Sequence, residues 1–144
     1  MDRRPKIAQR GFRPGARGAG LVLGELESAV IEVLWAEAGL TVVEVEERLR
    51  RARGIAHTTV LTTLDRMHRK GYLTREKNGK AFVYSPAYSR EEFEQRMARE
   101  VLGALVGNFT EPALSAFVDV IADDAGALDH LEQLIREKRK NSGS

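Results

Sequence analysis

The residues with the clearest chemistry lie in the stretch 56–71, which reads AHTTVLTTLDRMHRKG. At helical spacing, four apolar residues gather on one narrow side of this stretch and require a hydrophobic core: Val60, Leu61, Leu64 and Met67. Hydroxyls near the start and cations toward the end lie off that side: Thr58, Thr59, Thr62, Arg66 and Arg69. A helix with such a polar side can enter the major groove of double-stranded DNA, where threonines reach base edges and phosphates and arginines reach guanine or phosphate.

The alternative interpretation of this stretch is an ordinary surface helix with a polar outside. Threonine has a lower helix propensity than alanine, by roughly half a kcal/mol. Four threonines within the six positions 58–63 therefore favour a function other than helix formation. We also predict that His57, at the start of the helix, and Thr63 bind DNA. Gly71 is predicted to end the helix as the residue after its C-cap.

Catalysis finds little support in the sequence. The three histidines, at positions 57, 68 and 130, are not spaced as metal ligands on one helix face, and the chain has no cysteine. The strings HExxH and GxSxG and a phosphate-binding P-loop are all absent from the sequence. We therefore predict no enzymatic activity, no metal site and no cofactor.

Charge is distributed unevenly, although the net charge is only +2. Residues 1–20 carry six Lys or Arg against one Asp, and residues 53–80 carry seven against two Asp or Glu. This asymmetry is typical of a protein that binds nucleic acid, with chance clustering as the alternative. Residues 1–20 are predicted to form a disordered basic arm, whose Arg10, Arg13 and Arg17 either attract DNA or belong to a dispensable tail. No run of about 18 apolar residues is present, so we expect no membrane insertion and, by default, a cytoplasmic protein.

Two further helices must position the stretch 56–71. The segment Glu25–Ala36 has apolar residues at helical spacing, and its single tryptophan, Trp35, is expected to be structural. Thr41 begins the second helix, where Thr41 and Glu44 form a capping box. A short turn at 52–55 separates this helix from the next. A helix, a turn of a few residues and a helix with a hydrophilic side are typical of a helix-turn-helix.

A β-hairpin is predicted directly after the third helix, because the apolar period changes from 3.6 to 2. Its strands are expected at 72–76 and 81–85. Asn78-Gly79 between them predicts a type I′ turn, which requires positive φ at both central positions. Three cations make the hairpin basic: Arg75, Lys77 and Lys80. We predict that they contact phosphates beside the groove that the third helix occupies.

Three amphipathic helices are predicted in the region 87–140, and residues 141–144 are predicted to be a disordered tail. The first helix begins with the capping box Ser89–Glu92 and breaks at Gly107-Asn108, and the second begins at Thr110. Such helices make a poor independent core but a good dimer interface if two copies interdigitate. The alternative is a monomer in which they fold back on the hairpin domain. The predicted dimerisation residues are Phe93, Met97, Val101, Leu105, Leu114, Phe117, Ile121, Leu128, Leu131, Leu134 and Ile135.

The fold class that follows is mainly α with a small β-hairpin (α+β). It consists of a winged helix-turn-helix domain at residues 21–86 and a helical dimerisation domain at residues 87–140. Two segments resemble the penicillinase-repressor family, also called the methicillin-resistance-repressor family: LGELESAVIEVLWA at 23–36 and TVVEVEERLRRARGIAHTTVLTTLDRMHRKGYLTREKNGKAFVYSP at 41–86. The resemblance extends over about residues 21–140 and is strongest in TTVLTTLDRMHRKGYL and in the YSP that closes the hairpin.

The resemblance implies a dimeric bacterial transcriptional repressor that binds an inverted-repeat operator in double-stranded DNA. It also implies release from DNA when a membrane sensor protease triggers cleavage of an Asn-Phe bond in the dimerisation helices. Alignment places Ala116-Phe117 at that bond, and the pair Asn108-Phe109 lies several residues earlier, out of register. Copper-responsive members carry clustered cysteines near the C-terminus, so copper sensing by that route is excluded here.

Two other functions are consistent with the same sequence. A winged-helix regulator can bind a small effector between its lobes, and a winged helix can serve as a protein-interaction module. The interaction module predicts no steep dependence of DNA affinity on salt, whereas a repressor predicts one.

Overall fold

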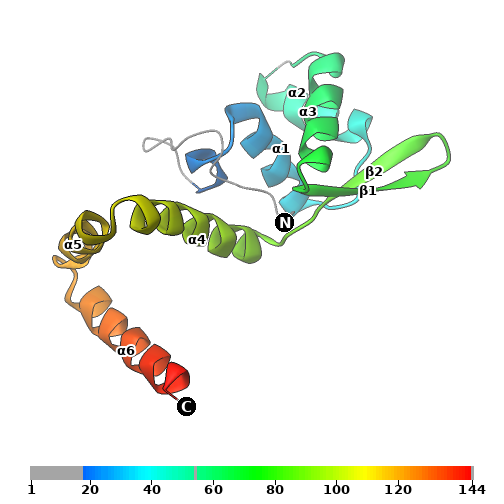
Figure 1. The fold of residues 1–144 in the computed structure, drawn as a ribbon. Coiled ribbons are helices and arrows are strands. Elements are labelled where there is room, and N and C mark those ends of the chain that lie inside the picture. The colour runs from blue at the N-terminus through cyan, green and yellow to red at the C-terminus, as the bar shows by residue number, and fades with distance from the viewer. Residues whose placement is uncertain (1–17, 54, 144) are drawn as a thin grey trace. The chain divides into compact units, whose positions relative to one another are not determined.

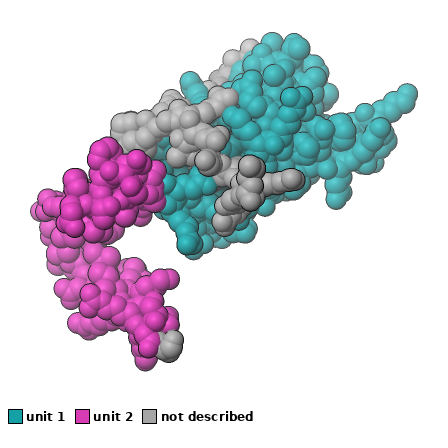
Figure 2. Space-filling model, viewed as in Figure 1, with its two compact units in different colours: residues 1–101 teal, residues 102–144 magenta. Residues whose placement is uncertain are grey.

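The structure, a computed structural model, describes residues 18–53 and 55–143, with residues 50–53 described in their backbone only (Figure 1). The chain divides into two compact units, residues 1–101 and residues 102–144 (Figure 2). The boundary falls inside helix α4 and later in the chain than the predicted domain boundary at residue 86. Most of the predicted basic arm, including Arg10, Arg13 and Arg17, lies outside the described residues.

The first unit contains the three predicted helices and the hairpin. A short 3-10 helix precedes them at Gly18–Leu21, and its Ala19 is buried, so the end of the predicted arm belongs to the fold. The three helices form a helix-turn-helix with one helix in front of it. Their bounds are α1 Glu25–Ala36, α2 Val42–Arg53 and α3 His57–Arg69.

Two predicted helix ends are confirmed by hydrogen bonds. At the start of α2, the Thr41 amide donates to the Glu44 carboxylate at 3.1 Å, and the Glu44 amide donates to the Thr41 hydroxyl at 3.3 Å. The bond from the Thr41 amide also lowers the pKa of Glu44, because it stabilises the charged carboxylate. At the end of α3, Gly71 has φ +85°, and the Tyr72 amide donates to the Met67 carbonyl at 2.9 Å, which is a Schellman motif.

The predicted hairpin is present, but its turn differs from the prediction. Strand β1 (Leu73–Asn78) pairs antiparallel with strand β2 (Ala81–Pro86), and Asn78 is opposite Ala81. The loop therefore consists of Gly79 and Lys80, one residue later than predicted. No non-glycine residue in the described part of the chain has positive φ, whereas Gly79 has φ +66°. A glycine with positive φ at the first loop position is the requirement of a type II′ turn, so type I′ was wrong.

The core of the first unit collects buried apolar side chains from every element. They are Ala19, Val22, Leu23, Val30, Ile31, Leu34, Leu40, Val45, Leu49, Val60, Leu64, Met67, Tyr72, Leu73, Tyr84 and Phe93. This set confirms the inward direction of Val60, Leu64 and Met67. Leu61 was wrongly assigned to the same stripe and is 42% exposed. It follows Val60 directly, so it is turned by about 100° away from the core around the helix axis.

Helix α4 (Arg90–Asn108) corrects a prediction about Phe93. The sequence predicts Phe93 to be a dimerisation residue, together with Met97, Val101 and Leu105. Phe93 is instead fully buried in the first unit, 5.3 Å between ring centroids from Trp35 and 6.5 Å from Tyr72. The Trp35 indole also donates to the Tyr88 carbonyl at 2.9 Å, which confirms its structural role. Met97, one helical turn further on, packs against the same core.

The start of α4 also has its predicted cap. The Ser89 amide donates to the Glu92 carboxylate and the Glu92 amide donates to the Ser89 hydroxyl, both at 3.1 Å. Val101, the last residue of the first unit, packs against the core as Met97 does. The first half of α4 therefore folds back on the winged domain, as the monomer alternative expected for the whole region. The helix continues through Asn108, and the predicted break falls at Phe109 instead.

The second unit contains the end of α4 and two further helices, α5 (Thr110–Ile121) and α6 (Ala125–Ser142). The carboxylate of Asp124 caps α6 by accepting from the Ala127 amide at 3.2 Å. Helix α6 extends through Ser142, two residues into the predicted tail. Neither α5 nor α6 contains a buried residue. Within the described ranges, no helix is both long and apolar enough to span a membrane.

Candidate nucleic-acid interface

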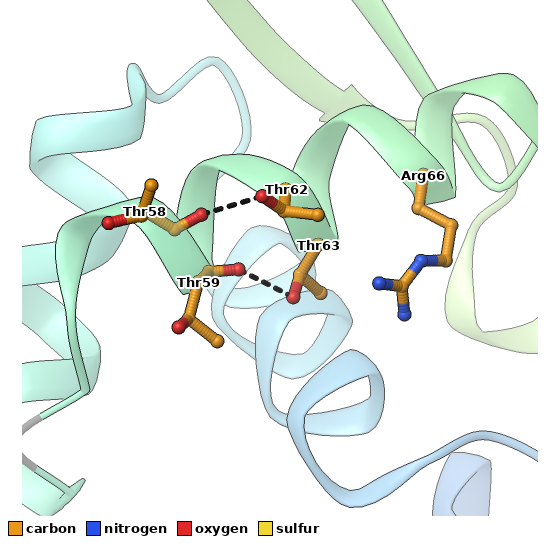
Figure 3. Close-up of a pocket in the computed structure, with 5 residues that line it drawn as sticks. All are labelled: Thr58, Thr59, Thr62, Thr63 and Arg66. Carbon is orange, nitrogen blue, oxygen red and sulfur yellow. Dashed lines mark hydrogen bonds between the residues drawn. The ribbon is translucent and has the colours of Figure 1, made fainter.

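One side of α3 is polar and open to solvent along its length. Its buried side holds the core residues described above, and its outer side exposes Thr58, Thr59, Thr62, Arg66 and Arg69. Four threonines and one arginine line a shallow depression of about 210 Å³ on this helix (Figure 3): Thr58, Thr59, Thr62, Thr63 and Arg66. The structure therefore brings together on one surface the hydroxyl groups and the guanidinium that the sequence singled out.

The threonine hydroxyls are partly used inside the helix. The Thr62 hydroxyl donates to the Thr58 carbonyl at 2.8 Å, and the Thr63 hydroxyl donates to the Thr59 carbonyl at 2.7 Å (Figure 3). A hydroxyl that donates in this way keeps only acceptor capacity for a ligand. Thr62 can therefore accept a hydrogen bond from a base amino group, and its methyl group can contact a thymine methyl.

Thr63 was predicted to bind DNA but is only 4% exposed. It lies three residues after Val60, so it shares the inner side of the helix rather than the outer one. Its place is at the wall of the depression, and its hydroxyl is bonded within the helix. Direct contact with a base is therefore the wrong role for this residue.

Arg66 lies beside a buried acid that the sequence analysis missed. Glu27 of α1 is 3% exposed, and its Oε1 lies 4.0 Å from Arg66 Nη1. The Arg66 side chain remains substantially exposed, so its other guanidinium nitrogens can still donate to a ligand. The signal in the sequence was weak, because Glu27 occupies the first turn of α1, where an acid is expected for helix-dipole reasons alone.

Asp65 forms ion pairs with the other two arginines that were predicted to bind DNA, Arg69 and Arg75. Arg69 Nη2 lies 2.7 Å from Asp65 Oδ2 and, across the domain, Arg75 Nη1 lies 3.2 Å from Asp65 Oδ1. Arg75 Nη1 also lies 3.4 Å from the Tyr84 hydroxyl, and its guanidinium carbon lies 4.1 Å from the centre of the Phe82 ring. The pKa of Arg75 is raised by its hydrogen bond to Tyr84 and, secondarily, by the one to Asp65. Arg75 is thus held between the hairpin and α3, whereas Arg69 stays largely exposed.

His57, at the start of α3, also has a protein partner. Its Nδ1 lies 2.6 Å from Oε2 of Glu46, a buried acid of α2. The imidazole is still more than half exposed at the edge of the polar side. The pair ties the start of α3 to α2.

The two lysines of the hairpin lie at its exposed end. Lys77 is opposite Phe82 near the end of β1, and Lys80 is in the two-residue loop. Neither lysine has an ion pair among those found in the described residues. The candidate surface therefore consists of the outer side of α3, which is suited to bases and phosphates, and a cationic hairpin end suited to phosphates.

Comparison with known proteins identifies one family. The model of the family described as "Penicillinase repressor" matches residues 23–137. "Transcriptional regulator BlaI" of Mycobacterium tuberculosis is 35% identical over 109 residues, which cover 74% of this chain and 79% of that protein. "Penicillinase repressor" of Bacillus licheniformis is 28% identical over 97 residues, which cover 62% of this chain and 76% of that protein.

Structures of BlaI are among the solved structures that resemble part of the chain. The solution structure of the DNA binding domain of the repressor BlaI is 28% identical, covers 49% of this chain and 85% of that chain, and has a TM-score of 0.45. The solution structure of the Bacillus licheniformis BlaI monomeric form in complex with the blaP half-operator has the same identity and coverage and a TM-score of 0.43.

Proposed function

Because the chain belongs to the penicillinase repressor family, we propose that it is a DNA-binding transcriptional repressor that acts as a homodimer on a palindromic operator. The observation that carries this proposal is the outer side of α3, which presents hydroxyl and guanidinium groups away from the core. The relatives from Mycobacterium tuberculosis and Bacillus licheniformis are described as a regulator and a repressor, which supports a regulatory rather than an enzymatic function. A repressor acts where the chromosome is, so we assign the protein to the bacterial cytoplasm.

In this proposal α3 enters the major groove. Thr62 and Arg66 contact base edges, while Thr58, Thr59 and Arg69 contact bases or the adjacent phosphates. Lys77 and Lys80, at the end of the hairpin, contact phosphate without reading sequence. Such phosphate contacts release counterions, so the affinity for DNA should fall steeply as salt increases. A protein-interaction module would lack this dependence, and a salt titration of DNA binding therefore separates the two functions.

The homodimer is supported by the second unit. This unit exposes large apolar side chains that a single copy leaves in water: Leu102, Leu105, Val106, Phe109, Leu114, Phe117, Val118, Val120, Leu134 and Ile135. Apolar surface of this extent is costly in a monomer and typical of an interface. A two-fold dimer would present two copies of α3 to DNA, so the target would be a palindrome with half-sites about one helical turn apart or a multiple of it.

We expect Thr62→Ala and Arg66→Ala each to weaken the DNA-binding free energy by about 1–3 kcal/mol, because each side chain contacts a base. The probe is a duplex that the wild-type protein selects from a randomised DNA pool, called here the selected duplex. Fluorescence anisotropy measures the affinity. Unchanged affinity in both variants would rule out entry of α3 into the groove.

Matched controls for this experiment exist elsewhere in the chain. The Thr110 hydroxyl donates to the Val106 carbonyl at 2.7 Å, the same i to i−4 bond that Thr62 makes. Arg99 is an exposed arginine of α4. Thr110→Ala and Arg99→Ala should leave the affinity for the selected duplex unchanged, so that a loss at Thr62 or Arg66 reflects position rather than residue type.

Relief of repression by proteolysis, with a membrane sensor protease as partner, is the regulation we propose on family grounds. Of the two bonds considered, Ala116–Phe117 lies inside α5, whereas Asn108–Phe109 joins the last residue of α4 to the single residue that precedes α5. Phe109 is 60% exposed and has non-helical φ −139° and ψ 60°. A bond at the exposed end of a helix is cut more readily than one inside a helix, so we assign the cut to Asn108–Phe109.

This assignment predicts fragments of residues 1–108 and 109–144. They should appear by mass spectrometry when the protein is co-expressed with a candidate membrane protease encoded beside it. Phe109→Ala should prevent the cut and Phe117→Ala should not. Cleavage after Ala116 in the wild-type protein would contradict the assignment.

A further inference from the structure

Asp65 is an acid in the middle of the surface that we assign to DNA. It lies on α3 between the groove-facing residues Thr62 and Arg69, and its side chain is one-third exposed. A carboxylate at such a place repels phosphate and opposes the cations around it. Asp65 therefore opposes DNA binding by its charge, and the contacts of its two carboxylate oxygens indicate a second role that favours binding.

The Asp65 carboxylate joins α3 to β1 and, through Arg75, to β2. Oδ2 pairs with Arg69 within α3 at 2.7 Å, and Oδ1 pairs with Arg75 of β1 at 3.2 Å. Arg75 then continues the connection to β2, through the Tyr84 hydroxyl at 3.4 Å and the face of the Phe82 ring at 4.1 Å. Tyr84 is buried and is opposite Arg75 in the strand register.

The hairpin needs such a connection because it is a two-stranded sheet, which is marginally stable by itself. Its base is anchored, since Leu73 and Tyr84 are buried and the Tyr84 amide donates to the Leu40 carbonyl at 2.8 Å. Beyond Arg75 the rest of β1 is exposed up to the loop. Among the ion pairs of the described residues, Arg75–Asp65 is the one that joins β1 to α3, and it lies two residues before Lys77.

We propose that Asp65 is a positioning residue that fixes the hairpin against α3, so that Lys77 and Lys80 meet phosphates while α3 occupies the groove. The inference rests on the proposed function and adds a residue that does not itself contact DNA. Arg75, which the sequence assigned to phosphate, becomes the partner of Asp65 in this arrangement. The pair is partly exposed, so its loss should affect the stability of the fold little.

Asp65→Asn separates this inference from simple electrostatics by the sign of its effect. Removing a negative charge beside DNA should strengthen binding if Asp65 only repels phosphate. If Asp65 positions the hairpin, Asp65→Asn should instead weaken binding to the selected duplex, on the order of fivefold. Glu76→Gln is the matched control, because Glu76 is an exposed acid of the same hairpin and its removal changes the charge equally. Glu76→Gln should leave binding unchanged or slightly stronger.

A double-mutant cycle tests whether the effect of Asp65 acts through the lysines. Lys77→Ala/Lys80→Ala should weaken binding and flatten its salt dependence in the wild-type background. The same pair should cost clearly less in the Asp65→Asn background, because the hairpin is no longer held in place. Equal losses in the two backgrounds would overturn the inference, and so would stronger binding by Asp65→Asn.

Arg75→Gln approaches the same contact from the other partner and covers the case in which Asp65→Asn fails to fold. Arg75→Gln should weaken binding to the selected duplex. The double variant Asp65→Asn/Arg75→Gln should bind this duplex no more weakly than whichever single variant has the lower affinity. A full second loss in the double variant would overturn the inference. The proposed function is tested separately, because it fails if the wild-type protein selects no duplex. If the wild-type protein binds its selected duplex and Asp65→Asn binds it equally well, only the role of Asp65 is refuted.

Discussion

Leu131→Asp is expected to convert the protein into a monomer and to weaken its binding to the selected duplex by roughly 10²–10⁴-fold. Leu131 lies on α6, whose apolar side chains remain unburied in a single copy. A charge in the proposed interface must be desolvated when two copies pair, which is costly without a partner charge. Without the dimer, the two half-sites are bound independently, and the gain from linking the two winged domains is lost.

Sedimentation velocity and anisotropy measure the two parts of this prediction. Gln133→Asp is the control, because Gln133 is two residues away on α6 and is therefore turned by about 200° around the helix axis. It introduces the same charge on the opposite side and should leave both dimer and affinity intact. A dimer that persists in Leu131→Asp would show that the interface lies elsewhere.

Phe93→Ala is expected to lower the free energy of unfolding of the first unit by about 3–5 kcal/mol, because it removes a fully buried aromatic ring. The lost contacts include those with Trp35 and Tyr72, which meet the ring edge to face. Urea denaturation followed by circular dichroism measures the loss. Because this loss is a large fraction of the free energy of unfolding of a small domain, DNA binding should fail together with folding.

Making Phe93→Ala both in the wild-type protein and in Leu131→Asp tests whether Phe93 is a dimer contact or a core residue of the first unit. If Phe93 were a dimer contact, Phe93→Ala would have little further effect in a protein that Leu131→Asp has already made monomeric. If it belongs to the core of the first unit, the loss of stability should be of the same size in both backgrounds. A loss below about 1 kcal/mol in the monomeric background would contradict the core assignment.

The outer side of α3 could be predicted from the sequence because it depends on helical spacing alone. Thr58, Thr62 and Arg66 lie off the side that Val60 and Met67 bury, and no knowledge of the neighbouring elements is needed to see this. The limits of spacing appear at the edges of that side. Leu61 and Thr63 flank the core stripe at opposite edges, and which of them is covered depends on where α1, α2 and the hairpin pack.

Contacts within a few residues were therefore determined by the sequence itself. The Thr41–Glu44 capping box and the end of α3 at Gly71 involve residues at most five apart, so local chemistry suffices to define them. The hairpin followed for the same reason, although the turn moved by one residue because glycine takes the positive φ at the first loop position.

Only the tertiary structure decided which of several equivalent apolar or charged residues finds a partner far along the chain. Phe93 and Leu105 repeat at the same spacing on α4, yet Phe93 is buried in the first unit and Leu105 stays exposed in the second. Arg75 is a cation of the hairpin like Lys77, yet only Arg75 lies within reach of Asp65. The reason is physical: spacing defines the side of an element on which a residue lies, whereas burial and ion pairing depend on what the folded chain places against that side.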